Sequence, residues 1–164
     1  MDAVLGIVLG LAALAAGMMA GVFAIFSTAV MAGLRRTDDR TFVGAFGEVD
    51  RSILSPVFLA MYLGALVLPA LAALLGLGEG AVAAWSAAAF VLYLAVVVIT
   101  GRIHLPRNDA LKAAGPVDAV PDHAAVRRAF DEDRWIRWNH LRAALSVAAT
   151  GCLLVALVEL GRQT

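Results

Sequence analysis

The chain has 164 residues, of which 62% are hydrophobic and 16% are charged, and its formal net charge at pH 7 is zero. A soluble globular domain is about half apolar and about a quarter charged, so this composition excludes an ordinary soluble protein. The length fits one domain, residues 1–164, and the neutral charge gives no reason to expect a nucleic-acid partner.

Four long runs contain no Lys, Arg, Asp or Glu at all. A helix needs about 20 apolar residues to cross the hydrocarbon of a bilayer. Three of the runs reach this length alone, and the fourth reaches it when the preceding turn is added. The sequence therefore predicts an all-α bundle of four membrane helices, at about residues 3–34, 52–77, 81–101 and 138–160.

The first run carries two pairs of glycines four residues apart, Gly6/Gly10 and Gly17/Gly21. Small residues at this spacing let a second helix approach closely. The pairs predict tight helix packing, either inside the chain or in a homo-oligomer formed through this helix.

Two polar loops, residues 35–51 and 102–137, separate the apolar runs from one another. The connection from Gly76 to Gly80 is short, so the second and third helices should form an antiparallel hairpin. Pro69 lies deep in the second run and should kink it. In the second loop, Asp122 is suited to cap a helix that we expect to run straight into the fourth membrane helix.

The placement of Lys and Arg predicts the orientation of the chain. Of 13 such residues, all but two lie in or at the edges of the two polar loops, and the exceptions are Arg142 and Arg162. Because cytoplasmic loops are enriched in Lys and Arg, both loops should be cytoplasmic and both termini should lie on the other side. We expect a multi-pass protein of the cell (plasma) membrane, with the lipid bilayer as its main partner.

The stretch RWIRWNHLR, residues 134–142, joins the second polar loop to the last apolar run. On a helix, Arg134 and Arg137 lie on roughly the opposite face from the remaining polar side chains, and they are suited to headgroups. The opposite face should turn toward the bundle; it consists of Trp135, Trp138, Asn139, Arg142 and Ser146. For Trp135, a place in the interfacial aromatic belt is an equal alternative.

The predicted topology brings the polar clusters of distant segments to one end of the bundle. The candidate site residues there are Asp50, Arg51, His104, Asn108, Trp138, Asn139 and Arg142. A charge buried in a membrane protein is usually paired or lines a cavity. An ion pair between Arg142 and Asp50 that only locks the bundle is therefore an alternative to a site.

Several chemistries have no signal in the sequence. There is no HExxH motif and no paired His/Cys spacing, so no metal site is expected. The middle of each apolar run lacks ionisable residues, which argues against a proton pump, an ion channel or a transporter.

The segment from Trp135 to Arg142 has the pattern Trp-x-x-Trp-Asn-x-x-Arg at the start of a membrane helix. With it, the chain resembles the anthrone-oxygenase-like family of small four-helix membrane proteins, most of which are catalogued as a domain of unknown function. The likeness covers nearly the whole chain, including AGVFAIFSTAVMAGL in the first helix.

Two other segments typical of this family are present in altered form. The family pattern Asn-x-Pro-x-Asn-x-x-Leu keeps Pro106, Asn108 and Leu111, and His104 takes the place of its first Asn. The family pairs Asn-Arg and Asn-Pro before the second helix are replaced by Asp50-Arg51 and Ser55-Pro56.

For a few family members, the resemblance implies an oxidoreductase that oxygenates anthrones without a cofactor. A deprotonated anthrone reacts directly with O₂, so the protein would bind this lipophilic substrate, accept its proton and stabilise the enolate. The resemblance makes His104, or else Asp50, the candidate base, and the candidate donors are Asn108, Asn139 and Arg142. The alternative is a non-catalytic binding or accessory subunit in which the same cluster is a structural lock.

Overall fold

The computed structural model describes residues 2–163, and every regular element within them is a helix. Four helical stretches are long and apolar enough to cross a membrane, namely Ala3–Leu34, Pro56–Leu75, Gly80–Ala113 and His123–Gln163. The predicted all-α class with four membrane helices is confirmed, and the chain is a multi-pass membrane protein.

Each membrane stretch is built from one main helix. The first combines α1 (Asp2–Ile25), the π-helical turn η1 (Phe26–Val30) and α2 (Met31–Leu34). The second is α4 (Pro56–Leu75), and the third begins with α5 (Gly80–Ile99). The fourth is mainly α8 (Glu132–Gln163).

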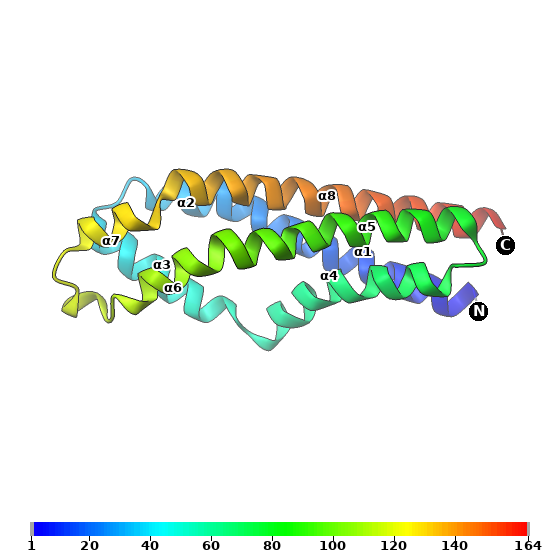
Figure 1. Ribbon diagram of the computed structural model, residues 1–164, viewed down its shortest axis with the longest axis horizontal. Coiled ribbons are helices and arrows are strands. Elements are labelled where there is room, and N and C mark those ends of the chain that lie inside the picture. The colour runs from blue at the N-terminus through cyan, green and yellow to red at the C-terminus, as the bar shows by residue number, and fades with distance from the viewer. Residues whose placement is uncertain (1, 164) are drawn as a thin grey trace.

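The helices run up and down, so that both termini and the α4–α5 connection lie at one end of the bundle (Figure 1). The predicted hairpin of α4 and α5 is present, with Glu79 N–H donating to Gly76 O across the turn at 2.8 Å. We call the opposite end, where the remaining short helices gather, the polar end. Which end faces the cytoplasm stays a prediction.

The predicted loops are largely helical, which corrects the expected boundaries. Beyond α5 the chain continues through a π-helical turn, η2 (Thr100–His104), into α6 (Leu105–Ala113). The first loop holds α3 (Asp39–Ile53), and the second also holds η3 (Val117–Ala119) and α7 (His123–Phe130).

These short helices form because each buries an apolar face at the polar end. Phe42 and Phe46 of α3 pack with Leu111 of α6, Phe130 of α7 and Trp135 of α8 in one cluster of buried side chains. The rings of Phe46 and Phe130 meet edge to face, with centroids 4.6 Å apart. Aromatic burial of this kind stabilises helices that are too short to persist alone in water.

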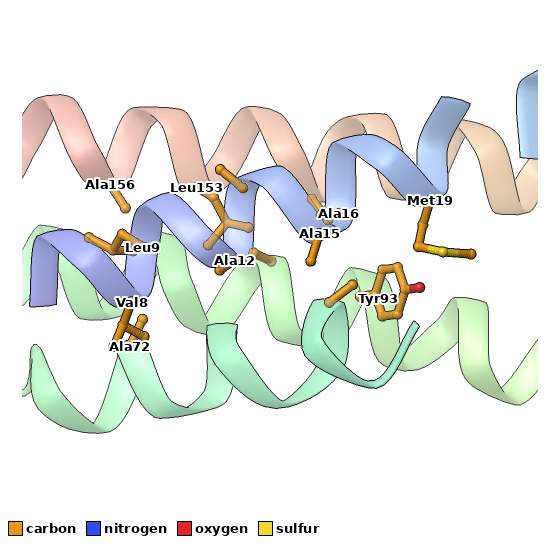
Figure 2. Close-up of a cluster of buried hydrophobic side chains, with 14 of the residues drawn as sticks. Val8, Leu9, Ala12, Ala15, Ala16, Met19, Ala72, Tyr93, Leu153 and Ala156 are labelled. Atoms are coloured by element: carbon orange, nitrogen blue, oxygen red, sulfur yellow. The ribbon is translucent and has the colours of Figure 1, made fainter. Parts of the chain in front are cut away.

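The main core lies between α1, α4, α5 and α8. Figure 2 shows Leu9, Ala12 and Ala16 of α1 beside Leu153 and Ala156 of α8, all of them almost fully buried. Small side chains dominate because they let the helix backbones approach closely.

The glycine pairs of α1 take part in this packing inside the chain. A Cβ added to Gly6 would meet Leu160 at 3.8 Å, and one added to Gly17 would meet Thr150 at 3.7 Å, both on α8. One glycine of each predicted pair therefore packs α1 against α8.

Asp122 and Asp38 cap helices at the polar end. Asp122 accepts a hydrogen bond from Ala125 N–H at 2.8 Å and begins α7, as predicted. Asp38 accepts hydrogen bonds from both the backbone N–H and the hydroxyl of Thr41, which lowers the pKa of its carboxyl group and begins α3.

The predicted helical extension from Asp122 into the last membrane helix is present, but it has a one-residue break that the sequence did not predict. The chain breaks at Asp131, whose φ of 56° is left-handed, and α8 starts at the next residue. Two contacts stabilise the break. The Asp131 carboxylate accepts a hydrogen bond from Arg134 N–H at 3.3 Å, and Arg127 Nε donates to Glu132 Oε1 at 2.6 Å across the break.

Replacing Asp131 by alanine should lower the stability of the protein by about 1–2 kcal/mol, because alanine caps no helix and disfavours the left-handed region. The thermal unfolding midpoint in detergent measures this effect. Asp131→Asn is the control, because asparagine tolerates the left-handed region and keeps an oxygen for Arg134 N–H. Equal midpoints for the two variants would show that the cap does not hold the break.

Candidate functional site

A cavity of about 330 Å³ lies where the four-helix core meets the polar end. Most of its wall is apolar and comes from α1, η1, α3, α4, α5, α6 and α8. The aliphatic and aromatic lining residues, with one glycine, are Val22, Phe23, Phe26, Phe46, Ile53, Leu54, Phe58, Leu59, Tyr62, Val97, Gly101, Leu105 and Trp135. The polar lining residues are Asp50, Thr100, His104, Asn108 and Arg142.

Both π-helical turns border this cavity. In η1, Met31 N–H reaches back five residues to Phe26 O, and in η2, Leu105 N–H reaches Thr100 O in the same way. A π-helical turn adds a residue to an α-helix, redirects the following side chains and is frequent at functional sites. Here η2 carries Thr100 and His104 into the cavity wall.

Arg142 is buried, with 6% of its surface exposed. Its Nη1 donates to Thr100 Oγ1 at 3.0 Å, and its Nη2 donates to Asn139 Oδ1 at 2.5 Å. The guanidinium lies 4.3 Å from the ring centroid of Phe23 and 5.7 Å from that of Trp135. Both hydrogen-bond acceptors are neutral.

The predicted alternative of an ion pair between Arg142 and Asp50 is wrong. Among residues 2–163, the carboxylate of Asp50 pairs with Lys112, at 2.8 Å, and accepts a hydrogen bond from Asn108. No carboxylate of the described residues pairs with Arg142, and its Nε has no hydrogen-bond partner there. The site thus contains a buried cation with spare hydrogen-bonding capacity.

Asn139 has a different environment from its neighbour on α8. It is fully buried, and its Nδ2 donates to Phe23 O at 2.7 Å and to Ser27 Oγ at 2.6 Å. These bonds tie α8 to α1 and η1. Asn139 does not line the cavity, and it holds the Arg142 guanidinium in place by accepting the hydrogen bond from Nη2.

A second polar group is bonded to the indole nitrogen of Trp135. Trp135 Nε1 donates to Asn108 Oδ1 at 2.9 Å, and Asn108 Nδ2 donates to Asp50 Oδ1 at 2.6 Å. Lys112, the last member of this hydrogen-bonded series, is partly exposed and links the series to solvent. Trp135 is therefore buried in the site, and its predicted alternative as an interfacial belt residue is wrong.

His104 is 1% exposed, and its ring packs edge to face on Trp135 with centroids 4.9 Å apart. Its Nε2 lies 3.3 Å from Trp135 O, and its Nδ1 is buried with no hydrogen-bond partner among the described residues. When Nε2 carries the proton and donates to Trp135 O, Nδ1 presents a free lone pair.

Besides Asn139, two more predicted site residues do not line the cavity. Arg51 is exposed and pairs with Glu48 at 2.5 Å, and Trp138 is half-buried on the edge of the inner face of α8. Arg134 and Arg137 are exposed, as predicted. Within residues 2–163, no group of three His, Cys, Asp or Glu side chains is arranged to share a metal ion.

Thr100 and Lys112, which bind Arg142 and Asp50, were not predicted as site residues. Helical spacing could have identified both, because residues four apart share a helix face: Thr100 precedes His104 by four residues, and Lys112 follows Asn108 by four. In an apolar run, however, a threonine ordinarily satisfies its own helix, and Thr100 Oγ1 also donates to Val96 O at 2.8 Å.

Comparison with known families identifies the family of this chain. A family model described as anthrone oxygenase matches residues 57–152, which is more than half of the chain. The chain belongs to the anthrone oxygenase family. The anthrone oxygenase match includes four of the five polar cavity residues; Asp50 lies before its first residue. No match was found among curated proteins or solved structures.

Proposed function

We propose that this protein binds a flat, lipophilic aromatic molecule in the cavity and oxygenates it without a cofactor, as an anthrone-type oxygenase of the cell membrane. The observation that carries the proposal is Arg142, a buried cation that lacks a carboxylate partner among the described residues and faces an aromatic-lined cavity. A buried charge is costly, so a negative charge on the ligand is the natural complement.

The proposed reaction gives each polar residue one role. His104 accepts a proton from the carbon opposite the carbonyl of an anthrone, which leaves an enolate. Arg142 stabilises the enolate oxygen, and the Phe and Trp rings exclude water from the carbanion. The enolate transfers electrons to O₂, the carbon–oxygen bond forms, His104 returns its proton to give a hydroperoxide, and loss of water gives the anthraquinone. One anthrone and one O₂ give one anthraquinone and one H₂O.

A second candidate function has a specific observation in its favour. Asn139 bonds to α1, η1 and Arg142, and Arg142 bonds to Thr100, so this group links three of the four membrane helices. In a non-catalytic binding or accessory subunit, such a group would serve as a structural lock. The cavity beside Arg142 favours the first candidate, because a lock requires no open space.

Replacing His104 by glutamine should reduce anthrone oxidation by about a hundredfold, because glutamine fills the space and bonds Trp135 O but cannot accept the proton. The measurement is the initial rate of O₂ uptake with anthrone in membranes that contain the protein, minus the spontaneous rate in empty membranes. His140→Gln is the matched control, because His140 is exposed on the outside of α8. An uptake rate in wild-type membranes equal to the spontaneous rate would refute the oxygenase proposal for this substrate.

A further inference from the structure

The cavity opens through a mouth with an apolar rim. Of the residues that line it, those classed as exposed are Leu54, Leu59, Gly101 and Leu105. The three leucines have 50%, 41% and 44% of their surface exposed, respectively. The rim thus lies between the α3–α4 corner on one side and the η2–α6 segment on the other.

The polar groups have the opposite distribution. His104, Asn108 and Arg142 are 1%, 7% and 6% exposed and form the floor of the cavity, and the other two polar lining residues, Asp50 and Thr100, are partly buried. A cavity that received its ligand from water would place such groups at its mouth and bury the leucines. Leucines at an opening are costly in water and stable against acyl chains.

The depth of the mouth is set by the α4–α5 hairpin. Each helix has 20 residues, which at about 1.5 Å per residue matches the roughly 30 Å of hydrocarbon in a bilayer. The first residue of α4 and the last residue of α5 therefore mark one boundary of the hydrocarbon. Leu59 lies just inside this boundary, and Gly101 lies just past it.

We propose that the cavity takes its ligand sideways from the bilayer, through the mouth between Leu59 and Gly101, and that the ligand is a membrane-dissolved aromatic with a hydrogen-bonding or acidic oxygen. Aromatic rings with one polar group accumulate at this depth of the membrane, as Trp and Tyr side chains do. Such a ligand turns its oxygen toward Arg142 as it leaves the lipid. This inference rests on the proposed function for the identity of the site and adds the source and class of the ligand.

Trp135 provides a reporter on the cavity floor, since the chain has two other tryptophans, Trp85 and Trp138, that phenylalanine can replace. The protein with Trp135 alone is placed in phosphatidylcholine vesicles. Hydroxyanthraquinone, a membrane-soluble quencher that cannot be oxidised further at its carbonyl carbons, is the first probe. Anthraquinone sulfonate, whose permanent charge keeps it in water, is the second.

Leucine at position 101 should close the mouth without disturbing the fold, because a Cβ at Gly101 would meet no heavy atom within 4 Å. Gly151→Leu is the matched control; Gly151 is likewise exposed and helical with no heavy atom near its Cβ, but it lies on α8 away from the cavity. We expect hydroxyanthraquinone to quench Trp135 according to its mole fraction in the lipid, in the parent and in Gly151→Leu. The Gly101→Leu variant should lose most of this quenching.

Three results would overturn access from the bilayer: equal quenching by both probes at the same total concentration, equal quenching in the two leucine variants, or no quenching by either probe. Because the readout is binding of a product-like quinone, it is independent of turnover. Quenching as expected together with no O₂ uptake from anthrone would refute the oxygenase and leave the bilayer route standing.

Discussion

Methionine in place of Arg142 should reduce anthrone oxidation by about a hundredfold or more while the protein remains folded, since an oxyanion partner is worth that much in other enzymes. The structure explains why this substitution should remove activity without unfolding the protein. Arg142 has no carboxylate partner among residues 2–163, so its removal leaves no opposite charge unpaired. Methionine fills a similar volume and packs well on the rings of Phe23 and Trp135.

The stability of the Arg142→Met variant should fall by less than about 2 kcal/mol, because two lost hydrogen bonds are offset by relief from burying a cation. Arg137→Met is the matched control; Arg137 is exposed on the same helix and its replacement should change neither activity nor stability. O₂ uptake and the thermal unfolding midpoint are measured on the same membranes. An Arg142→Met protein that retains wild-type uptake would contradict the assigned role.

The membrane helices follow from the sequence because hydrocarbon imposes a simple rule, a long run without charges. No such rule acts at the polar end. There, α3 and α6 form because Phe42, Phe46 and Leu111 meet side chains from distant segments, such as Phe130 and Trp135. A lone apolar residue in a polar stretch gives no hint of a partner dozens of residues away. The predicted third and fourth membrane helices were therefore too short, and the second predicted loop was too long.

The part of the site that was predicted correctly depends only on the helical period, which decides which side chains of a helix share a face. Spacing along α8 correctly placed Asn139, Arg142 and Ser146 on the inner face, and all three are buried. Pairing across helices was beyond the sequence, because η1 and η2 each add a residue to a turn and change which side chains face one another. Arg142 consequently bonds to Thr100, and the alternative pairing with Asp50 that the sequence suggested does not form.

Asn139 and Arg142 have different contacts, which indicates that the two residues have different roles. Both residues lie on the same face of α8, one turn apart, and they bond to each other. Both amide hydrogens of Asn139, however, are donated to α1 and η1, whereas Arg142 lines the cavity and its Nε has no hydrogen-bond partner among residues 2–163. Mutations at the two positions should therefore affect different properties.

Alanine in place of Asn139 should lower the stability of the protein by about 2–4 kcal/mol, because it removes a buried group with three hydrogen bonds and leaves a void. The lost bonds are those to Phe23 O and Ser27 Oγ and the one from Arg142. We expect reduced accumulation in membranes and a lower thermal unfolding midpoint. Activity per folded molecule should fall less than in Arg142→Met, because the cavity floor keeps its cation.

His140→Ala is the control for this comparison, because His140 is the next residue on α8 and is exposed. Normalising O₂ uptake to the folded fraction, measured by size-exclusion chromatography in detergent, separates stability from catalysis. If Asn139→Ala accumulated normally and lost uptake as fully as Arg142→Met, Asn139 would belong to the reaction, and the tie between α8 and α1 would not limit stability. If both variants failed to fold, the cluster would be a lock throughout, and the second candidate function would be favoured.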